Sequence, residues 1–253
     1  MFFDSHAHLN DPQFDADREA VIAKMKEQNV GGMMNVGCCY ASSLDAIRLA
    51  QTYDWCYAAV GTHPEDAQEV DEDLIARYRE LCNDPRVKAI GEIGLDYYYD
   101  SNPPREVQKR AFHLQMQLAE ELSMPVIIHD RDAHGDCMQI VDEFPKVKGV
   151  FHCYSGAIEM AKELVKRGWY IGFTGVVTFK NARKAVQVAE WLPLSRLLIE
   201  TDCPFMAPEP HRGTRNDPSY VPLMAEKIAQ IKGISTEAVE KATWQNAHEL
   251  FRI

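Results

Sequence analysis

The chain has 253 residues, of which 46% are hydrophobic and 26% are charged. These proportions are those of an ordinary globular protein, and the length suits a single α/β barrel domain. The formal net charge of −11, from 27 basic and 38 acidic residues, argues against a broad basic face for duplex DNA or anionic lipid. A nucleic-acid substrate remains compatible with this charge, because bound cations and a few arginines can supply positive potential at a small site.

Seven cysteines are scattered along the chain, an odd number with no C-x-x-C pair. This pattern predicts reduced thiols and not a disulfide framework. The N-terminal segment MFFDSHAHLND lacks the basic and apolar regions of a signal peptide, and no apolar run is long enough to span a bilayer. We therefore expect a cytoplasmic protein that does not associate with a membrane.

Short apolar runs alternate with amphipathic stretches from the first residue onward. After the first run, Val21, Ile22 and Met25 recur at helical spacing. The expected strands are residues 1–7, 32–37, 56–61, 87–94, 125–129, 149–152, 169–174 and 196–201. The expected helices are residues 17–28, 42–52, 73–82, 105–122, 137–144, 158–167, 182–191 and 221–232, and two short closing helices are expected from Ser235 onward.

Eight strand–helix units of fairly even size are the number that a (β/α)8 TIM barrel requires, so the sequence predicts an α/β fold of this class. No linker or low-complexity run interrupts the pattern, which predicts one domain over residues 1–253. The longest polar stretch, residues 203–219, has a length typical of functional loops. A doubly wound open sheet is the alternative, but no glycine-rich phosphate fingerprint follows the first strand.

Six potential metal ligands fall at the carboxyl ends of five expected strands. They are His6, His8, Glu92, His129, His152 and Asp202. In a barrel these strand ends surround one bowl, where active sites form. Residues i and i+2 of a strand face the same side, so His6 and His8 can converge on one ion. Imidazole and carboxylate donors suit several divalent metals, and thiolate is not needed.

Four imidazoles and two carboxylates can hold two divalent cations. We expect one ion on His6, His8 and Asp202 and the other on His129 and His152, with Glu92 shared. Each residue alone has a plainer explanation, because a strand-end histidine can be merely hydrogen-bonded and an aspartate can cap the next element. Their joint placement favours the metal site. The residue types do not choose among Mg²⁺, Mn²⁺ and Zn²⁺.

Six segments of the chain resemble those of a known family of enzymes. FFDSHAHL, VGTHPEDA, AIGEIGLDYY, PVIIHDRDA, FHCYSG and ETDCPF are similar in order and spacing to the TatD family of metal-dependent deoxyribonucleases, within the amidohydrolase superfamily. The similarity runs from Phe2 to nearly the end of the chain. The resemblance implies a (β/α)8 barrel, a 3′–5′ exonuclease activity on DNA with a divalent cation, and metal roles for the same six residues.

A bowl with two cations suits hydrolysis of a phosphodiester by a metal-activated water. Asp202 is the candidate proton acceptor as well as a ligand, and Glu92 is the second candidate catalytic residue. Glu200, two residues before Asp202, should face the same side of its strand. It either orients a metal ligand or belongs to a structural ion pair.

Candidate substrate contacts follow the third, fifth and eighth expected strands. They are His63, Arg131, Arg212 and Arg215. Arginine forks match phosphate oxygens, although a solvated charge is the plainer alternative for any one loop arginine. His63 could bind a phosphate or act as an acid on the leaving group, and it could instead serve only as a cap beside Pro64.

Three consecutive tyrosines, Tyr97, Tyr98 and Tyr99, follow the fourth expected strand. Aromatic side chains stack on exposed bases in proteins that bind single strands. Packing against the next helix is an equally good explanation for these residues.

The favoured substrate is DNA, as single strands or 3′ ends. A small-molecule amidohydrolase, such as a lactonase, a cyclic amidase or a deaminase, is the alternative, because the fold and the metals serve both chemistries. The arginine cluster argues against it, and Glu92 stands where some amidohydrolases place a carbamylated lysine. A non-catalytic binding protein on the same scaffold is the third hypothesis, and the complete ligand set argues against that one.

Overall fold

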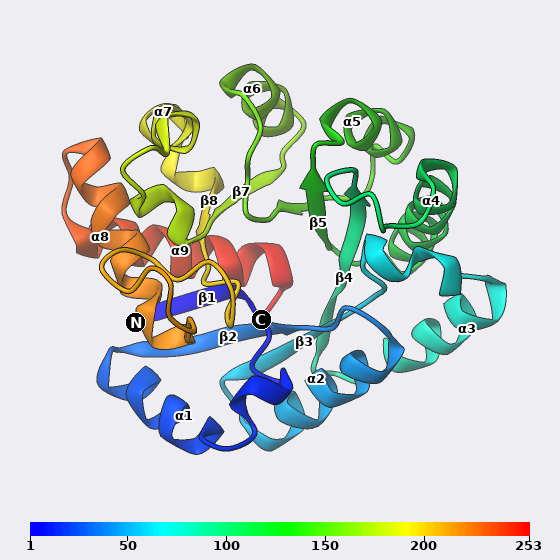
Figure 1. Ribbon diagram of the computed structural model, residues 1–253, viewed down its shortest axis with the longest axis horizontal. Helices are drawn as coiled ribbons and strands as arrows, with labels where there is room; N and C mark the ends of the chain where they lie inside the picture. Colours follow the sequence, from blue (N-terminus) through cyan, green and yellow to red (C-terminus); the bar gives the residue numbers. More distant parts are fainter. The chain divides into compact units, whose positions relative to one another are not determined.

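Strands and helices alternate along the whole chain (Figure 1). The structure, a computed structural model, describes residues 1–253. The strands are β1 (Phe2–Ala7), β2 (Val30–Val36), β3 (Cys56–Val60), β4 (Val87–Asp96), β5 (Val126–Arg131), β6 (Gly149–Phe151), β7 (Tyr170–Phe173) and β8 (Leu197–Ile199). The α-helices are α1 (Arg18–Glu27), α2 (Tyr40–Thr52), α3 (Glu72–Leu81), α4 (Arg105–Leu122), α5 (His134–Glu143), α6 (Ile158–Lys166), α7 (Arg183–Trp191), α8 (Val221–Lys232) and α9 (Thr236–Phe251). Five 3₁₀ turns complete the chain: η1 (Pro12–Phe14), η2 (Pro64–Glu69), η3 (Gly175–Thr178), η4 (Leu194–Arg196) and η5 (Pro218–Tyr220).

Eight parallel strands, each followed by helices, are the elements of a (β/α)8 TIM barrel, so the predicted fold class is confirmed. The chain divides into two compact units, residues 1–35 with 152–253 and residues 36–151. In the first unit β1 pairs with β2, and β7 pairs with β8. In the second unit β3, β4, β5 and β6 pair in chain order. The predicted single domain stays a prediction.

The second unit shows why the apolar runs become strands. Val126, Ile127 and Ile128 of β5 are all fully buried. Strands of a parallel sheet are covered on both faces, so they consist of continuous β-branched runs instead of alternating ones. The neighbouring helix α4 is amphipathic, with Phe112 and Met116 buried one turn apart, and it packs against β4.

In the first unit, helix α9 closes the chain by packing against β1 and β8. Ser235 caps this helix by accepting a hydrogen bond from the backbone N–H of Ala238. The expectation of two short closing helices was wrong, because α9 is one continuous helix over Thr236–Phe251. No proline or glycine interrupts this segment, so the helix continues through it without a break.

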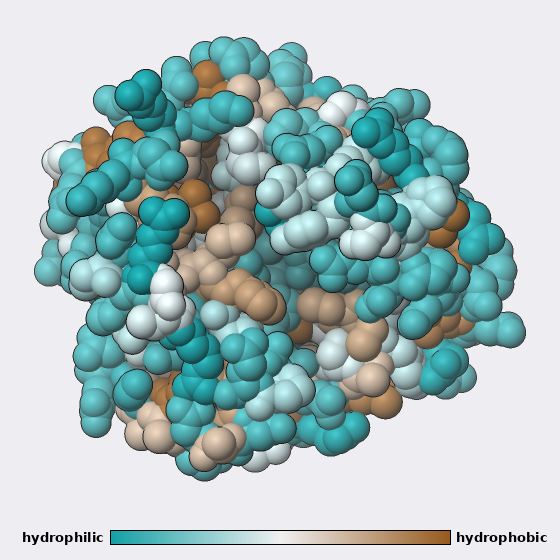
Figure 2. All heavy atoms as spheres, viewed as in Figure 1, coloured by the Kyte–Doolittle hydropathy of each residue, from teal (hydrophilic) through white to brown (hydrophobic).

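The surface is largely hydrophilic, as the face drawn in Figure 2 shows. Six large hydrophobic residues are exposed: Met1, Tyr98, Tyr99, Phe205, Met206 and Ile234. Two of the six, Tyr98 and Tyr99, are adjacent in the segment after β4. None of the helices combines the length and the apolarity that a membrane span requires.

Gly94 in β4 allows close backbone approach beside a predicted ligand. Its φ is +139°, and a Cβ there would lie 2.0 Å from the carbonyl oxygen of His129. We expect Gly94→Ala to lower the free energy of unfolding by about 2 kcal/mol or more, because strain and a backbone clash coincide. Urea unfolding measures this. Gly135→Ala is the control, because a Cβ there meets nothing within 4 Å and alanine favours the helix. Equal midpoints for the two variants would contradict the prediction.

Candidate metal centre

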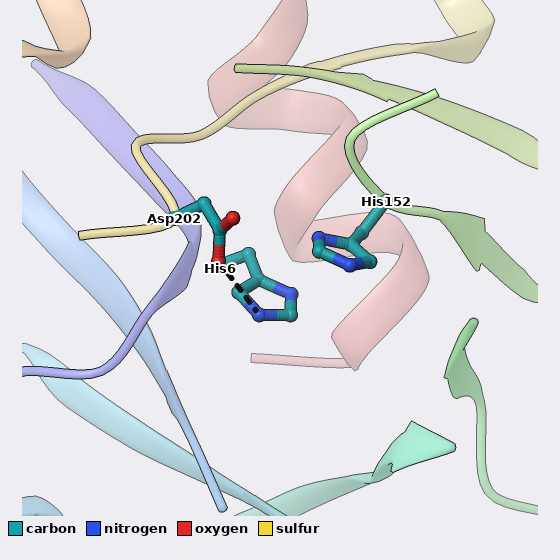
Figure 3. Close-up of side chains that lie close together, drawn as sticks. All are labelled: His6, His152 and Asp202. Carbon is teal, nitrogen blue, oxygen red and sulfur yellow. Dashed lines mark ion pairs between the residues drawn. The ribbon is translucent and has the colours of Figure 1, made fainter. Parts of the chain in front are cut away.

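Four predicted ligands come together in the first unit: His6, His8, His152 and Asp202. We call them the His6 set. His6 belongs to β1, His152 directly follows β6, and Asp202 lies after β8. Figure 3 shows the side chains of His6, His152 and Asp202 pointing toward one another. One donor atom from each of these three lies within 4.8 Å of the other two.

The distances within the His6 set suit a shared cation. The Nε2 atoms of His6 and His8 are 3.1 Å apart, and Asp202 Oδ1 lies 3.4 Å from His8 Nε2 and 3.7 Å from His6 Nε2. Two ligands about 2.0 Å from one tetrahedral ion are about 3.3 Å apart. The three donor atoms therefore have the spacing of ligands around one ion. The ring of His152 stacks on that of His6, with centroids 4.0 Å apart.

Asp202 is buried, yet it favours the charged form. Burial opposes its ionisation, but the hydrogen bond with His8 and the charges of His152 and His6 outweigh burial and lower the pKa of this carboxyl. Its positive φ of 58° places it outside the regular strand geometry of β8. An ionised carboxylate that faces imidazoles can bind a cation or accept a proton.

Two buried carboxyls hold the His6 set in place. Asp4 accepts hydrogen bonds from the backbone N–H of Thr201 at 2.9 Å and from the Thr201 hydroxyl at 2.5 Å, which fixes the residue before Asp202 against β1. Burial raises the pKa of Asp4 to about 8, despite these hydrogen bonds. No role was predicted for Asp4, because only its hydrogen bonds to the segment after β8 reveal one.

Glu200 is the second of these carboxyls. It is fully buried, accepts hydrogen bonds from the Ser5 hydroxyl at 3.1 Å and the Cys153 N–H at 2.6 Å, and lies 3.6 Å from His152 Nδ1. Of the two alternatives for Glu200, these contacts favour the one in which it orients a ligand, because no arginine or lysine lies within ion-pair distance of it.

A second group of potential ligands belongs to the second unit, and we call it the Glu92 set: His63, Glu92 and His129. One donor atom from each lies within 4.8 Å of the others. Glu92 Oε1 lies 2.8 Å from His129 Nδ1 and 3.8 Å from His63 Nε2. His63 was expected as a substrate contact, as an acid or as a cap, and its Nδ1 does accept the capping hydrogen bond from the Glu65 N–H. Its place among these ligands is new. The thiol of Cys38 donates a 3.9 Å hydrogen bond to Glu92 Oε2, a contact that no motif in the sequence indicates.

Asp96 supports the Glu92 set from the end of β4. Its Oδ2 lies 3.2 Å from His129 Nε2, and its Oδ1 accepts a hydrogen bond from the backbone N–H of Tyr98. Burial opposes ionisation of Asp96, but the hydrogen bonds from His129 and Tyr98 and the charges of His129 and Arg131 lower its pKa. Asp96 was not among the predicted site residues.

The six predicted ligands are therefore found in two groups. Within the first unit, His152 lies with His6 and Asp202, although it was expected to share an ion with His129. Glu92 and His129 lie together in the second unit. The division of the ligands between two ions, and the sharing of Glu92, stay predictions.

The three predicted arginines differ in their partners. Arg215 forms a two-pronged ion pair with Asp17, at 2.9 and 2.6 Å, and covers the ring of Phe14. Arg212 is exposed and lies over Phe179, with its Cζ 4.3 Å from the ring centroid. Arg131 lies over Tyr98. The engagement of Arg215 with Asp17 leaves it least available to a phosphate.

The three tyrosines after β4 also differ. Tyr97 packs against the following helices, because its hydroxyl donates to Asp136 at 2.7 Å and Arg105 covers its ring. Tyr98 and Tyr99 remain exposed. The packing explanation therefore fits Tyr97 alone.

Comparisons with known proteins show the family to which the chain belongs. The family model described as "TatD related DNase" matches residues 3–252. The metal-dependent hydrolase YabD of Bacillus subtilis (strain 168) is 45% identical, over 100% of both chains. A "3'-5' ssDNA/RNA exonuclease TatD" of Cronobacter sakazakii is 36% identical, over 98% of this chain and 97% of its own. The crystal structure of YJJV, a TatD homologue from Escherichia coli K12, superposes with a TM-score of 0.94 at 28% identity, over 100% of this chain and 98% of the other.

Replacing Asp96 by asparagine should weaken metal binding. The variant keeps the shape of the side chain but removes the negative charge beside His129 Nε2, and loss of such a partner lowers metal affinity by about 10- to 100-fold. Competition with a chromophoric chelator for Mn²⁺ or Zn²⁺ measures the affinity. Asp136→Asn is the matched control, because Asp136 bonds to Tyr97 and to no residue of the Glu92 set. An affinity equal to that of the control would contradict the role of Asp96.

Proposed function

Because the chain belongs to the TatD-related DNase family and is a metal-dependent hydrolase, we propose that it hydrolyses phosphodiester bonds of DNA from single-stranded 3′ ends. The observation that carries the proposal is the spacing of His6, His8 and Asp202, whose donor atoms lie 3.1 to 3.7 Å apart. The relatives named as exonucleases support the nucleic-acid substrate.

Two divalent cations per chain are part of the proposal. The His6 set would hold one and the Glu92 set the other, since each offers imidazole and carboxylate donors. Cations bound there would activate water and stabilise charge on the phosphoryl oxygens. Mg²⁺, Mn²⁺ and Zn²⁺ all suit these donors.

The residues themselves would position the substrate and move protons. Asp202 is the proposed proton acceptor, because its carboxylate is ionised and lies at the edge of the His6 set. Glu92 is the second proposed catalytic residue, held by His129 at 2.8 Å. His63, Arg131 and Arg212 are the proposed contacts to phosphate. Arg215 was predicted as a fourth contact, but its ion pair with Asp17 makes it the least available of the arginines.

A cytoplasmic location is also proposed. All seven cysteines are free thiols, as expected in a reducing compartment.

Removing one member of either set should abolish hydrolysis. For Glu92→Ala, His129→Ala and Asp202→Asn we expect kcat/KM on end-labelled single-stranded DNA to fall by about a thousandfold or more. Each variant removes a proposed ligand of a cation whose positive charge would stabilise the transition state. The substrate panel includes duplex DNA, an RNA oligomer and lactones. His113→Ala is the control, since His113 lies on α4 and contacts Glu143. Turnover of a lactone without cleavage of any nucleic acid would reject the nuclease proposal in favour of a small-molecule amidohydrolase.

Metal removal gives an independent prediction. Dialysis against a chelator should eliminate activity, and addition of a divalent cation should restore it, because no other electrophile is proposed for the phosphoryl group. Elemental analysis after metal-supplemented purification should give close to two equivalents per chain. Fewer than one equivalent, or full activity of the metal-free protein, would contradict the scheme with two cations.

A further inference from the structure

An exposed pair of aromatic rings lies beside the Glu92 set. Tyr98 is 55% exposed and Tyr99 is 45% exposed, so both present large ring surfaces to solvent. Their rings meet edge to face, with centroids 4.8 Å apart. Exposed aromatic rings that no packing requires are a feature of surfaces that bind other molecules. We call Tyr98, Tyr99 and Arg131 the tyrosine platform.

Arg131 adds a positive charge to the platform. Its Cζ lies 3.9 Å from the ring centroid of Tyr98 and 4.9 Å from that of Tyr99, and its Nη1 donates to the Tyr99 hydroxyl at 3.3 Å. The guanidinium therefore covers part of each ring while the rest of the rings stays accessible. Aromatic faces together with an arginine are the combination that single-stranded nucleic acids recognise, because bases stack on the rings and a phosphate pairs with the cation.

The platform is joined to the Glu92 set through one carboxylate. Asp96 faces His129 with Oδ2 and holds the backbone N–H of Tyr98 with Oδ1, at 3.2 and 2.9 Å. Arg131 follows His129 by two residues on β5 and pairs in register with Asp96. Arg131 is thus two residues from His129 on β5, and Tyr98 is four residues past Gly94, the residue of β4 that pairs with His129.

Hydrogen bonds hold the platform in shape before any substrate arrives. The N–H of Tyr97 donates to the Arg131 carbonyl at 2.9 Å, and the N–H of Asn102 donates to the Tyr99 carbonyl at 3.1 Å. The side chain of Asn102 also donates to the Asp96 carbonyl at 3.2 Å. A surface ordered in advance loses less conformational entropy on binding.

We propose that the tyrosine platform is a base-stacking subsite, which takes an unpaired base of single-stranded nucleic acid next to the phosphodiester to be cut. The proposal rests on the proposed function and deepens it by stating how single strands are selected. A base in a duplex is already stacked and paired, so only an unpaired base can lie on Tyr98 or Tyr99.

The double variant Tyr98→Ala with Tyr99→Ala tests the subsite. We expect its KM for a single-stranded oligonucleotide to rise about tenfold while kcat changes less than about twofold. The KM for the same oligonucleotide with abasic sites at its 3′ end should not change. Tyr98→Phe with Tyr99→Phe should recover most of the loss seen in the double alanine variant, because the ring faces remain and only the hydrogen bond from Arg131 to the Tyr99 hydroxyl is removed. Tyr57→Ala is the matched control, since Tyr57 lies in β3, under the side chain of Arg86, and is not part of the platform.

A binding measurement separates this proposal from the proposed function. In the presence of a chelator, stacking should quench the fluorescence of 2-aminopurine placed at the 3′ end of the oligonucleotide, for wild type and not for the double alanine variant. Quenching without cleavage by the metal-loaded wild type would support the subsite and reject the nuclease activity. Cleavage with an unchanged KM in the double variant, or equal losses on abasic and intact strands, would overturn the subsite. Neither quenching nor cleavage by wild type would overturn both.

Discussion

A carboxylate shut away from water needs a cation, a proton or several hydrogen bonds, and this requirement shapes both ligand sets. Asp202 and Glu92 are 8% and 3% exposed, and each faces imidazole nitrogens instead of an arginine or a lysine. The imidazole nitrogens alone give only part of the compensation that these two carboxylates need. A divalent cation bound by the imidazoles and the carboxylate together would complete it, which is why we attribute a metal-binding function to these buried groups.

Three other buried carboxyls hold the ligands in place. Asp4 and Glu200 in the first unit, and Asp96 in the second, each bond to a ligand or to the residue beside one. Such partners fix the rotamer of an imidazole and the nitrogen that it presents. Of the three, Asp96 has a lowered pKa and adds negative charge beside His129, whereas burial raises the pKa of Asp4 to about 8 and favours its uncharged form near neutral pH.

The placement of these residues at or near strand ends could be predicted from the alternation of apolar runs and helices. The run from Pro125 to His129 predicted a strand with a ligand at its end, and β5 covers Val126–Arg131. The register and the end of β4 were harder to predict from the sequence. The register shift between Ile90 and Ile93 and the extension of the strand to Asp96 both depend on pairing with β5. Asp96 was missed for this reason. The partner of Arg215 could not be predicted either, since Asp17 is 198 positions away in the chain.

Fold and chemistry are separable in this protein, because one barrel scaffold supports many reactions. What distinguishes the chain is the residues at its strand ends: a ligand set in each unit and, in the second unit, the exposed tyrosines with Arg131, in a sequence that carries 11 net negative charges. Selection of a single strand would then depend on local aromatic and cationic groups and not on a broad basic surface.

Anomalous diffraction from crystals soaked in Mn²⁺ tests the central claim most directly. The account predicts strong peaks about 2.0 to 2.3 Å from donor atoms of His6, His8 and Asp202 and from donor atoms of Glu92 and His129. Peaks at other acidic residues, with the imidazoles of His6 and His129 still bonded to their carboxylate neighbours, would contradict it.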